Sequence, residues 1–151
     1  MVEIIVYAEK YHEDFRRLNM EWLDKYNLAE SHDLMVLADP KGVILDKGGF
    51  IWLAKVGDEI IGSAALMFEG HDTYELAKMS VTKSWQGKGI SKLLLDTCLN
   101  KAREIAAKRI TLYSNHQLVN ALRLYEKYGF RNIELVNSPF ETADIRMELF
   151  L

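Results

Sequence analysis

Apolar residues recur every three or four positions in several stretches of the chain, which is the repeat of one helix face. The first such stretch passes through Phe15, Leu18, Trp22 and Tyr26. Further helices are predicted over Ser31 to Leu37, from about Lys88 to Ala107, and over Leu118 to Tyr128. Gly129 directly follows the last of these and is typical of a left-handed helix stop.

Short apolar runs bounded by turn residues predict strands. The residues Val56-Gly57-Asp58-Glu59 form a short turn that joins two of these runs into an antiparallel hairpin. The strands are predicted over Glu3 to Tyr7, Phe50 to Lys55, Ile60 to Met67, Thr73 to Val81, Lys108 to Tyr113, Phe130 to Val136 and Ile145 to Leu149. Strands and helices alternate in the second half of the chain. The pattern therefore predicts an α/β (α+β) fold with a mixed sheet and helices on both faces.

The length and net charge of the chain limit the classes of protein to which it can belong. With 151 residues, of which 49% are hydrophobic, the chain is long enough for one core, and we expect a single domain over residues 1–151. The net charge of −3 and the lack of a basic cluster argue against a nucleic-acid or anionic-membrane partner. There is no apolar run of membrane-spanning length and no leader-like segment, so we expect a cytoplasmic protein.

The chain has a single cysteine, Cys98, which excludes an intramolecular disulfide. Cys98 falls on the apolar face of the long predicted helix, so we expect a buried core residue rather than a reactive thiol. The four dispersed histidines and this one cysteine lack zinc-ligand spacing, and we predict no metal site.

The segment from Met79 to Lys92 runs from a predicted strand through Gly87 and Gly89 into a predicted helix. Glycines allow the backbone to approach an anion closely because they have no Cβ. The free N–H groups and partial positive charge of a helix N-terminus also favour a phosphate. The segment therefore predicts a loop that binds a phosphate-bearing cofactor.

Three known glycine motifs compete for this segment. A Walker-type P-loop requires Gly-Lys followed by Ser or Thr, whereas Gly87-Lys88 is followed by Gly89. A Rossmann fingerprint requires a further Gly or Ala where this chain has Lys92. The remaining pattern is Gln/Arg-x-x-Gly-x-Gly/Ala between a strand and a helix. It matches Gln86-Gly87-Lys88-Gly89-Ile90-Ser91, with Ser91 as the small last residue.

With this pattern the sequence resembles the GNAT superfamily of N-acetyltransferases. A second block, Ala121-Leu122-Arg123-Leu124-Tyr125-Glu126-Lys127-Tyr128-Gly129-Phe130, is similar to the family's Ala-x-x-x-Tyr-x-x-x-Gly-Phe segment. The two motifs occur in the family's order, and the resemblance covers nearly the whole chain. It implies a mostly antiparallel central sheet with a splayed pair of parallel strands that binds acetyl-CoA.

The resemblance implies that acetyl-CoA is the cosubstrate. Its pyrophosphate would bind the loop formed by Gln86, Gly87, Lys88, Gly89, Ile90 and Ser91, and its pantetheine arm would pair with the backbone of Met79, Ser80 and Val81. Many relatives have an asparagine seven residues before the tyrosine of the second motif, where this chain has Leu118. The nearby Asn115 and Asn120 are the candidates for that polar contact with the cofactor.

Acetyl transfer to an amine needs a deprotonated nucleophile and a proton for the departing thiolate. By resemblance, Tyr125 occupies the family's frequent general-acid position. Glu75 lies eleven residues before Gln86, a spacing similar to that of the catalytic glutamate in the histone-acetylating branch. Strand alternation predicts that Glu75 shares a face with Met79 and Val81. Glu75 is therefore the candidate base, and a water relay with a structural role for Glu75 is the alternative.

The region of the first two helices combines aromatic and acidic residues, which suits a cationic amine. The candidate substrate-binding residues are Trp22, Tyr26, Glu30 and Asp33. An ordinary pair of amphipathic helices with a charged outer face explains the same pattern.

Together these observations predict transfer of an acetyl group from acetyl-CoA to a primary amine of a small molecule or peptide, by direct attack in a ternary complex. A non-catalytic acyl-CoA-binding sensor is the alternative. A homodimer is also predicted, with the strands from Phe130 to Val136 and from Ile145 to Leu149 as the candidate edges.

Overall fold

A computed structural model describes all 151 residues. At its centre is a seven-stranded sheet in the order β1-β2-β3-β4-β5-β7-β6. The strands are β1 (Glu3–Val6), β2 (Phe50–Val56), β3 (Glu59–Phe68), β4 (Thr73–Val81), β5 (Arg109–Ser114), β6 (Arg131–Ile133) and β7 (Ile145–Phe150). Neighbouring strands are antiparallel except β4 and β5, which are parallel. The prediction of a mixed, mostly antiparallel sheet is confirmed.

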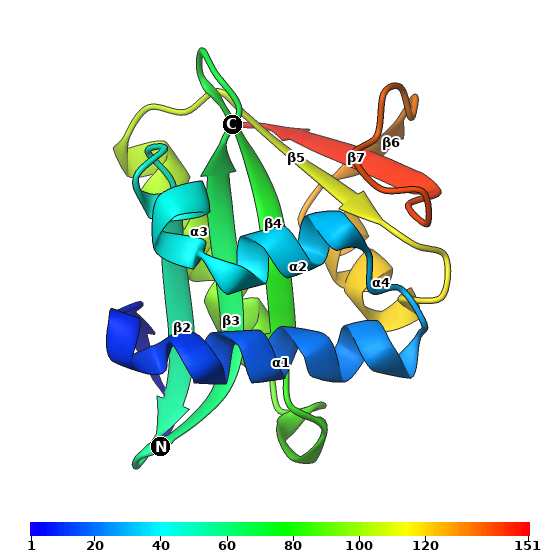
Figure 1. The fold of residues 1–151 in the computed structure, drawn as a ribbon. Coiled ribbons are helices and arrows are strands. Elements are labelled where there is room, and N and C mark those ends of the chain that lie inside the picture. Colours follow the sequence, from blue (N-terminus) through cyan, green and yellow to red (C-terminus); the bar gives the residue numbers. More distant parts are fainter.

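Helices cover both faces of the sheet, as predicted (Figure 1). One face carries α1 (His12–Lys25) and α2 (Ser31–Ala38), and the other carries α3 (Ile90–Glu104) and α4 (Val119–Lys127). Three short helical turns lie in the connections: η1 (Glu9–Tyr11), η2 (Lys41–Leu45) and η3 (Lys83–Trp85). None of the helices combines the length and apolar character that a membrane crossing requires.

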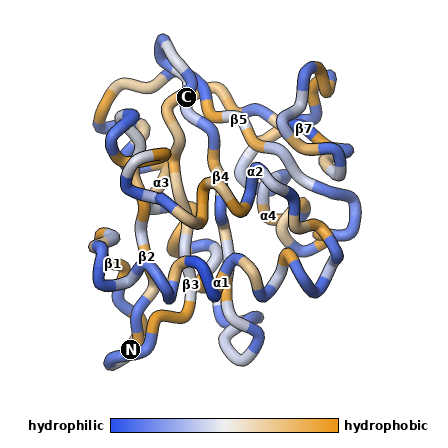
Figure 2. The backbone as a smooth tube through the Cα atoms, viewed as in Figure 1, coloured by the Kyte–Doolittle hydropathy of each residue, from blue (hydrophilic) through white to orange (hydrophobic).

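Two hydrophobic clusters fill the space between the sheet and its helices. The cluster on the α1 side contains Phe15 and Leu18, and the cluster on the α3 side contains Leu94 and Cys98. In Figure 2 the hydrophobic colour is strong along the central strands, while much of the rim is hydrophilic. Cys98 is fully buried, which confirms the expectation of a core residue, and burial raises the pKa of its thiol well above the ordinary value.

The parallel strands β4 and β5 pair over only a short distance. The ladder consists of three residue pairs, from Thr73 with Arg109 to Glu75 with Thr111. Beyond this point the strands separate, so the main-chain groups of β4 that face β5 lack a strand partner. This is the splayed pair that the family resemblance implies, and it opens a gap in the middle of the sheet.

Lys78 adds one residue to β4 and forms a β-bulge. Ala77 pairs with Ala65 of β3 and Ser80 pairs with Ser63, so two residues of β4 lie opposite one residue of β3. Lys78 adopts φ = 53°, the left-handed region that non-glycine residues rarely occupy. The bulge lies just past the point at which β5 separates from β4.

The bulge reverses the alternation of side chains along β4, and the prediction that Glu75 shares a face with Met79 and Val81 is wrong. Glu75 pairs with Met67 of β3, which packs against the α1-side cluster. Met79 and Val81 pack against the α3-side cluster instead. Because the inserted residue shifts the parity by one, Glu75 lies on the face that α1 and α2 cover.

Two further boundaries differ from the predictions. The strand expected from Phe130 to Val136 is limited to β6, and residues 134–144 form a long connection to β7. The expectation that Ile145 to Leu149 is a free edge is wrong, because β7 lies between β5 and β6. The edges are β1 and β6, and the homodimer stays a prediction.

Helix α3 is shorter than the predicted span from Lys88 to Ala107. Gly89 is its N-cap, and Ala106 takes a left-handed conformation with φ = 59° just beyond its end. The N–H of Ala107 then donates to the carbonyl of Ala102, which closes the helix without a glycine.

Candidate active site

Gly87 and Gly89 form the turn that enters α3. Both have positive φ, at 76° and 80°, so any other residue would be strained there. A Cβ added to either glycine meets no atom within 4 Å, so the space in front of this turn is open. The turn is therefore shaped to let an anion approach the backbone closely.

The first turn of α3 has no side-chain cap. The first intrahelical bond runs from the N–H of Leu93 to the carbonyl of Gly89, which leaves the N–H groups of Ile90, Ser91 and Lys92 without helical partners. The side chain of Ile90 is buried in the core, so only its backbone can serve a ligand. This arrangement fits the pyrophosphate of acetyl-CoA, which needs several N–H donors at one point.

The neighbouring polar side chains are near this turn but engaged elsewhere. The Lys88 ammonium lies 5.5 Å from the centre of the Trp85 ring, and the Gln86 amide donates to the carbonyl of Val81 over 3.0 Å. Ser91 is partly exposed at the helix start. The pairing of Gln86 with Val81 fixes the turn to the end of β4.

The side chains of the predicted pantetheine-binding segment serve packing. The Ser80 hydroxyl donates to the carbonyl of Leu18 over 2.8 Å, which ties α1 to β4, while Met79 and Val81 face the α3-side core. What this segment offers a ligand is therefore the unpaired backbone edge that faces β5.

Tyr125 lies on α4 and is buried in the α3-side cluster, with its ring centre 5.7 Å from that of Phe130. Burial raises the pKa of the Tyr125 phenol well above its ordinary value, and no hydrogen bond contributes to the change. A phenol in this state keeps its proton at neutral pH, which an acid requires. Asn120, on the first turn of the same helix, is exposed.

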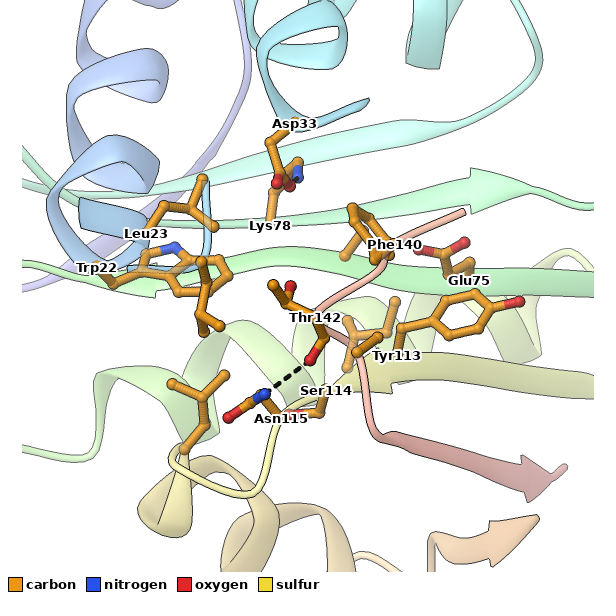
Figure 3. Close-up of a pocket in the computed structure, with 15 residues that line it drawn as sticks. Trp22, Leu23, Asp33, Glu75, Lys78, Tyr113, Ser114, Asn115, Phe140 and Thr142 are labelled. Atoms are coloured by element: carbon orange, nitrogen blue, oxygen red, sulfur yellow. Dashed lines mark hydrogen bonds and ion pairs between the residues drawn. The ribbon is translucent and has the colours of Figure 1, made fainter. Parts of the chain in front are cut away.

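A cavity of about 80 Å³ opens on the other face of the gap (Figure 3). Its lining comes from α1, α2 and the turn between them, from β4, from β5 and the residues that follow it, and from the connection between β6 and β7. Aromatic walls are formed by Trp22, Tyr113 and Phe140. Its charged lining residues are Asp33, Glu75 and Lys78.

Glu75 is buried in this cavity. Burial raises the pKa of its carboxyl to about 8, with the nearby Glu69 carboxylate acting in the same direction and Lys78 and Arg146 opposing it. A group that titrates close to neutral pH is suited to accept a proton from an amine.

Lys78 and Asp33 form an ion pair that the sequence pattern does not predict. The Lys78 Nζ is 2.6 Å from the Asp33 Oδ1, and their side chains are only 5% and 4% exposed. The other carboxylate oxygen of Asp33 accepts the N–H of Glu30 as part of a capping box at the start of α2. Asp33 was identified as a candidate in the sequence, but no local signal indicates that its partner is Lys78.

The loop that carries Phe140 is fixed over the cavity by hydrogen bonds. The Glu30 carboxylate accepts the N–H of Glu141 over 2.8 Å, and both the N–H and the hydroxyl of Thr142. The Asn115 amide donates to the carbonyl of Thr142 over 2.7 Å (Figure 3). The acidic residue at the start of α2 therefore positions the loop.

The four candidate substrate residues have different positions. Trp22 and Asp33 line the cavity, and the Trp22 N–H donates to Asn19 over 3.1 Å. Glu30 and Tyr26 do not line it; Glu30 binds the loop, and the Tyr26 ring lies 5.2 Å from the Lys25 ammonium. Asn115, a candidate for a cofactor contact, lines the same cavity and holds the loop.

Comparisons with known proteins agree on one family. Residues 8–130 match the model of the Acetyltransferase (GNAT) family. An uncharacterized N-acetyltransferase of Bacillus subtilis is 32% identical over 130 residues, which cover 84% of this chain and 83% of that protein.

Solved structures share the fold. An acetyltransferase of the GNAT family from Staphylococcus aureus aligns over 99% of both chains with a TM-score of 0.92 and 23% identity. PaiA N-acetyltransferase from Thermoplasma acidophilum, solved in complex with coenzyme A, covers 100% of this chain and 99% of its own, with a TM-score of 0.78 and 17% identity.

Proposed function

Because the chain belongs to the Acetyltransferase (GNAT) family, we propose that it transfers the acetyl group of acetyl-CoA to a primary amine of a small molecule or peptide, by direct attack in a ternary complex. The observation that carries this proposal is the arrangement around the β4–β5 gap. An uncapped glycine turn follows β4. A buried carboxyl with a raised pKa, that of Glu75, lines a small cavity at the gap between β4 and β5.

The glycine turn is proposed to bind the pyrophosphate through the N–H groups of Gly87 to Ser91, and the free edge of β4 to bind the pantetheine arm. When bound, acetyl-CoA supplies an activated acetyl group whose C–S bond breaks as the C–N bond to the amine forms. An N–H of β4 near Ser80 or Val81 is the proposed donor to the thioester oxygen.

Glu75 is proposed to take the proton from the incoming ammonium group. Its position in the aromatic cavity supports this role. The cavity lies on the face of the sheet opposite α3, whereas the cofactor turn leads into α3. An amine in the cavity would therefore lie next to Glu75 and across the gap from the cofactor turn. The raised pKa matches a base that works near neutral pH.

Tyr125 is proposed to donate a proton to the departing thiolate sulfur. Its buried phenol keeps its proton, and its position in the second family motif supports the assignment. The proposed base, Glu75, and the proposed acid, Tyr125, thus lie on opposite faces of the sheet. The gap between β4 and β5 connects the two faces.

The test is calorimetric titration of the protein with acetyl-CoA, coenzyme A and NAD, together with a thiol-release assay over a mixed panel of amines. Selective binding of coenzyme A and thiol release that depends on an amine are expected. Binding of coenzyme A without release on any amine contradicts the enzyme and favours a sensor, and equal binding of NAD contradicts the assignment of the glycine turn.

A further inference from the structure

Resting on the proposed function, we infer that the acceptor is an arylalkyl monoamine without a carboxylate, and that Asp33 sets this specificity by neutralising Lys78. Lys78 is the only cationic residue that lines the cavity. Whether its charge is free or already paired decides which acceptors the cavity accepts.

The charge of Lys78 is fully engaged. Asp33 holds the ammonium at 2.6 Å, and both side chains are almost completely shielded from solvent. Asp33 is itself fixed by the N–H of Glu30, so it does not move aside without loss of the helix cap. An acceptor carboxylate would have to compete with Asp33 for Lys78 and would lie beside the Asp33 charge, which is unfavourable in a buried site.

The charges around Glu75 leave room for one ammonium group. Glu69 faces Glu75 from the β3–β4 connection, Arg146 faces it from β7, and Lys78 faces it from β4. With Asp33, these are three carboxylates and two cations, so the surroundings carry one net negative charge when Glu75 is ionised. A monoamine neutralises that charge, whereas a second amine of a polyamine finds no partner.

Arg146 does not offer an alternative site for a carboxylate within the cavity. Its guanidinium lies 5.4 Å from the centre of the Tyr113 ring, and Arg146 does not belong to the lining. Its Nε has no hydrogen-bond partner, but this atom is shielded from solvent and is not open to an acceptor in the cavity. The ring of Tyr113, which is part of the lining, is therefore the surface that an acceptor meets on this side.

The aromatic residues that line the cavity favour an acceptor with an aromatic ring close to its ammonium group. Trp22, Tyr113 and Phe140 surround the cavity, and Phe140 lies 6.0 Å from Tyr113 and 4.9 Å from His32, ring centre to ring centre. Aromatic faces attract both flat apolar groups and cations. The cavity volume of about 80 Å³ favours a short linker between the ring and the amine.

The experiment compares phenethylamine with phenylalanine, which share the ring and the amine and differ by the carboxylate, and adds spermidine as a polyamine. Mixtures compete for acetyl-CoA, and mass spectrometry gives the ratios of kcat/KM. The wild type is expected to prefer phenethylamine over each of the others by about 100-fold, because like-charge contacts cost several kcal/mol. In Asp33→Asn the preference over phenylalanine is expected to fall at least about tenfold, because Lys78 becomes available.

Because each ratio comes from one mixture, it does not depend on how much of the variant folds. Asp24→Asn, the same change on the exposed end of α1, is the matched control and should leave the ratios unchanged. A wild type that prefers phenylalanine or spermidine overturns the inference, and so does an unchanged ratio in Asp33→Asn.

Binding of the amines to the protein with coenzyme A, measured by calorimetry, separates this inference from the proposed function. Selective binding of phenethylamine with no acetylation of any amine supports the specificity and contradicts the enzyme. Acetylation of other amines with no binding of phenethylamine contradicts the specificity and keeps the enzyme. If neither phenethylamine nor phenylalanine binds and neither is acetylated, the inference is wrong.

Discussion

Glu75 and Tyr125 lie on opposite faces of the central sheet. Glu75 pairs with Met67 on the face that α1 covers, whereas Tyr125 packs into the cluster beneath α3. The two strands that pair up to Glu75 separate immediately beyond it. The proposed base and the proposed acid are therefore separated by the sheet and would not exchange a proton with each other.

Glu75→Gln is expected to lower kcat/KM by about 100-fold, since a positioned base typically contributes at least this much. In the wild type kcat/KM should rise with pH through about 8, where Glu75 loses its proton, and the variant should lack this rise. A pH profile of thiol release measures both effects.

Glu69→Gln is the matched control for that profile. Glu69 is exposed and raises the pKa of Glu75, so its removal should move the rise to lower pH without abolishing it. If Glu75→Gln retains the wild-type profile, a water relay deprotonates the amine.

The same substitution, Glu75→Gln, should stabilise the fold at alkaline pH. Because folding raises the pKa of Glu75 from 4.5 to about 8, the folded state binds more protons between these values, and stability falls as the pH rises through them. Thermal unfolding should show a higher Tm for Glu75→Gln at pH 9, by roughly 4 °C or more. At pH 4 the two proteins should have similar Tm values, and a constant difference at both pH values contradicts the shift.

Tyr125→Phe is expected to lower kcat by about 100-fold while leaving the affinity for coenzyme A and the Tm nearly unchanged. The phenol has no hydrogen bond whose loss would destabilise the fold. A large loss of thiol release, together with unchanged binding of coenzyme A by calorimetry, is the result that distinguishes an acid from a packing residue.

Tyr128→Phe, on the same helix surface, provides the contrast. The Tyr128 hydroxyl donates to Asp96 over 2.5 Å, so its removal should cost roughly 1 kcal/mol of stability and spare turnover. Equal loss of activity in both variants would reduce Tyr125 to a structural role.

Much of the fold could be predicted from the sequence because its signals are local. Helix periodicity, the hairpin turn and the glycines before α3 each involve residues close together in the chain. The features of the site that were missed depend on distant residues: Lys78 meets Asp33 across 45 positions, and Glu30 meets Thr142 across 112. The bulge has no local signal either, because a lysine rather than a glycine takes the left-handed conformation.

Lys78→Met is expected to destabilise the protein by about 3 kcal/mol or more, because it leaves the Asp33 carboxylate buried without a counter-charge. The double variant Lys78→Met, Asp33→Asn should recover much of this loss, since it removes both charges. Chemical denaturation of the wild type, both single variants and the double variant measures the coupling. If the stability losses of the two single variants simply add in the double variant, the Lys78–Asp33 ion pair has no coupling energy.

Gly89→Ala should weaken binding of coenzyme A by at least about tenfold and cost about 1 kcal/mol of stability, the latter because alanine is strained at φ = 80°. Gly57→Ala in the β2–β3 turn is the matched control. Gly57 also has positive φ, and an added Cβ there likewise meets no atom within 4 Å. The control should lose similar stability and bind coenzyme A normally, and a loss of binding in both variants points to a general effect on the fold.

The bulge at Lys78 separates what the sheet needs from what the cavity needs. Without this one residue a regular ladder with β3 would form, in which Ser80 still pairs with Ser63 and Val81 with Gly62, so the side chains beyond the bulge would keep their present faces. The loss would fall on the α1 face instead, where the carboxylate of Asp33 would be buried with no cation beside it. The inserted lysine is therefore dispensable for strand pairing, and it is the charge balance of the cavity that requires a short stretch of irregular backbone in an otherwise ordinary strand.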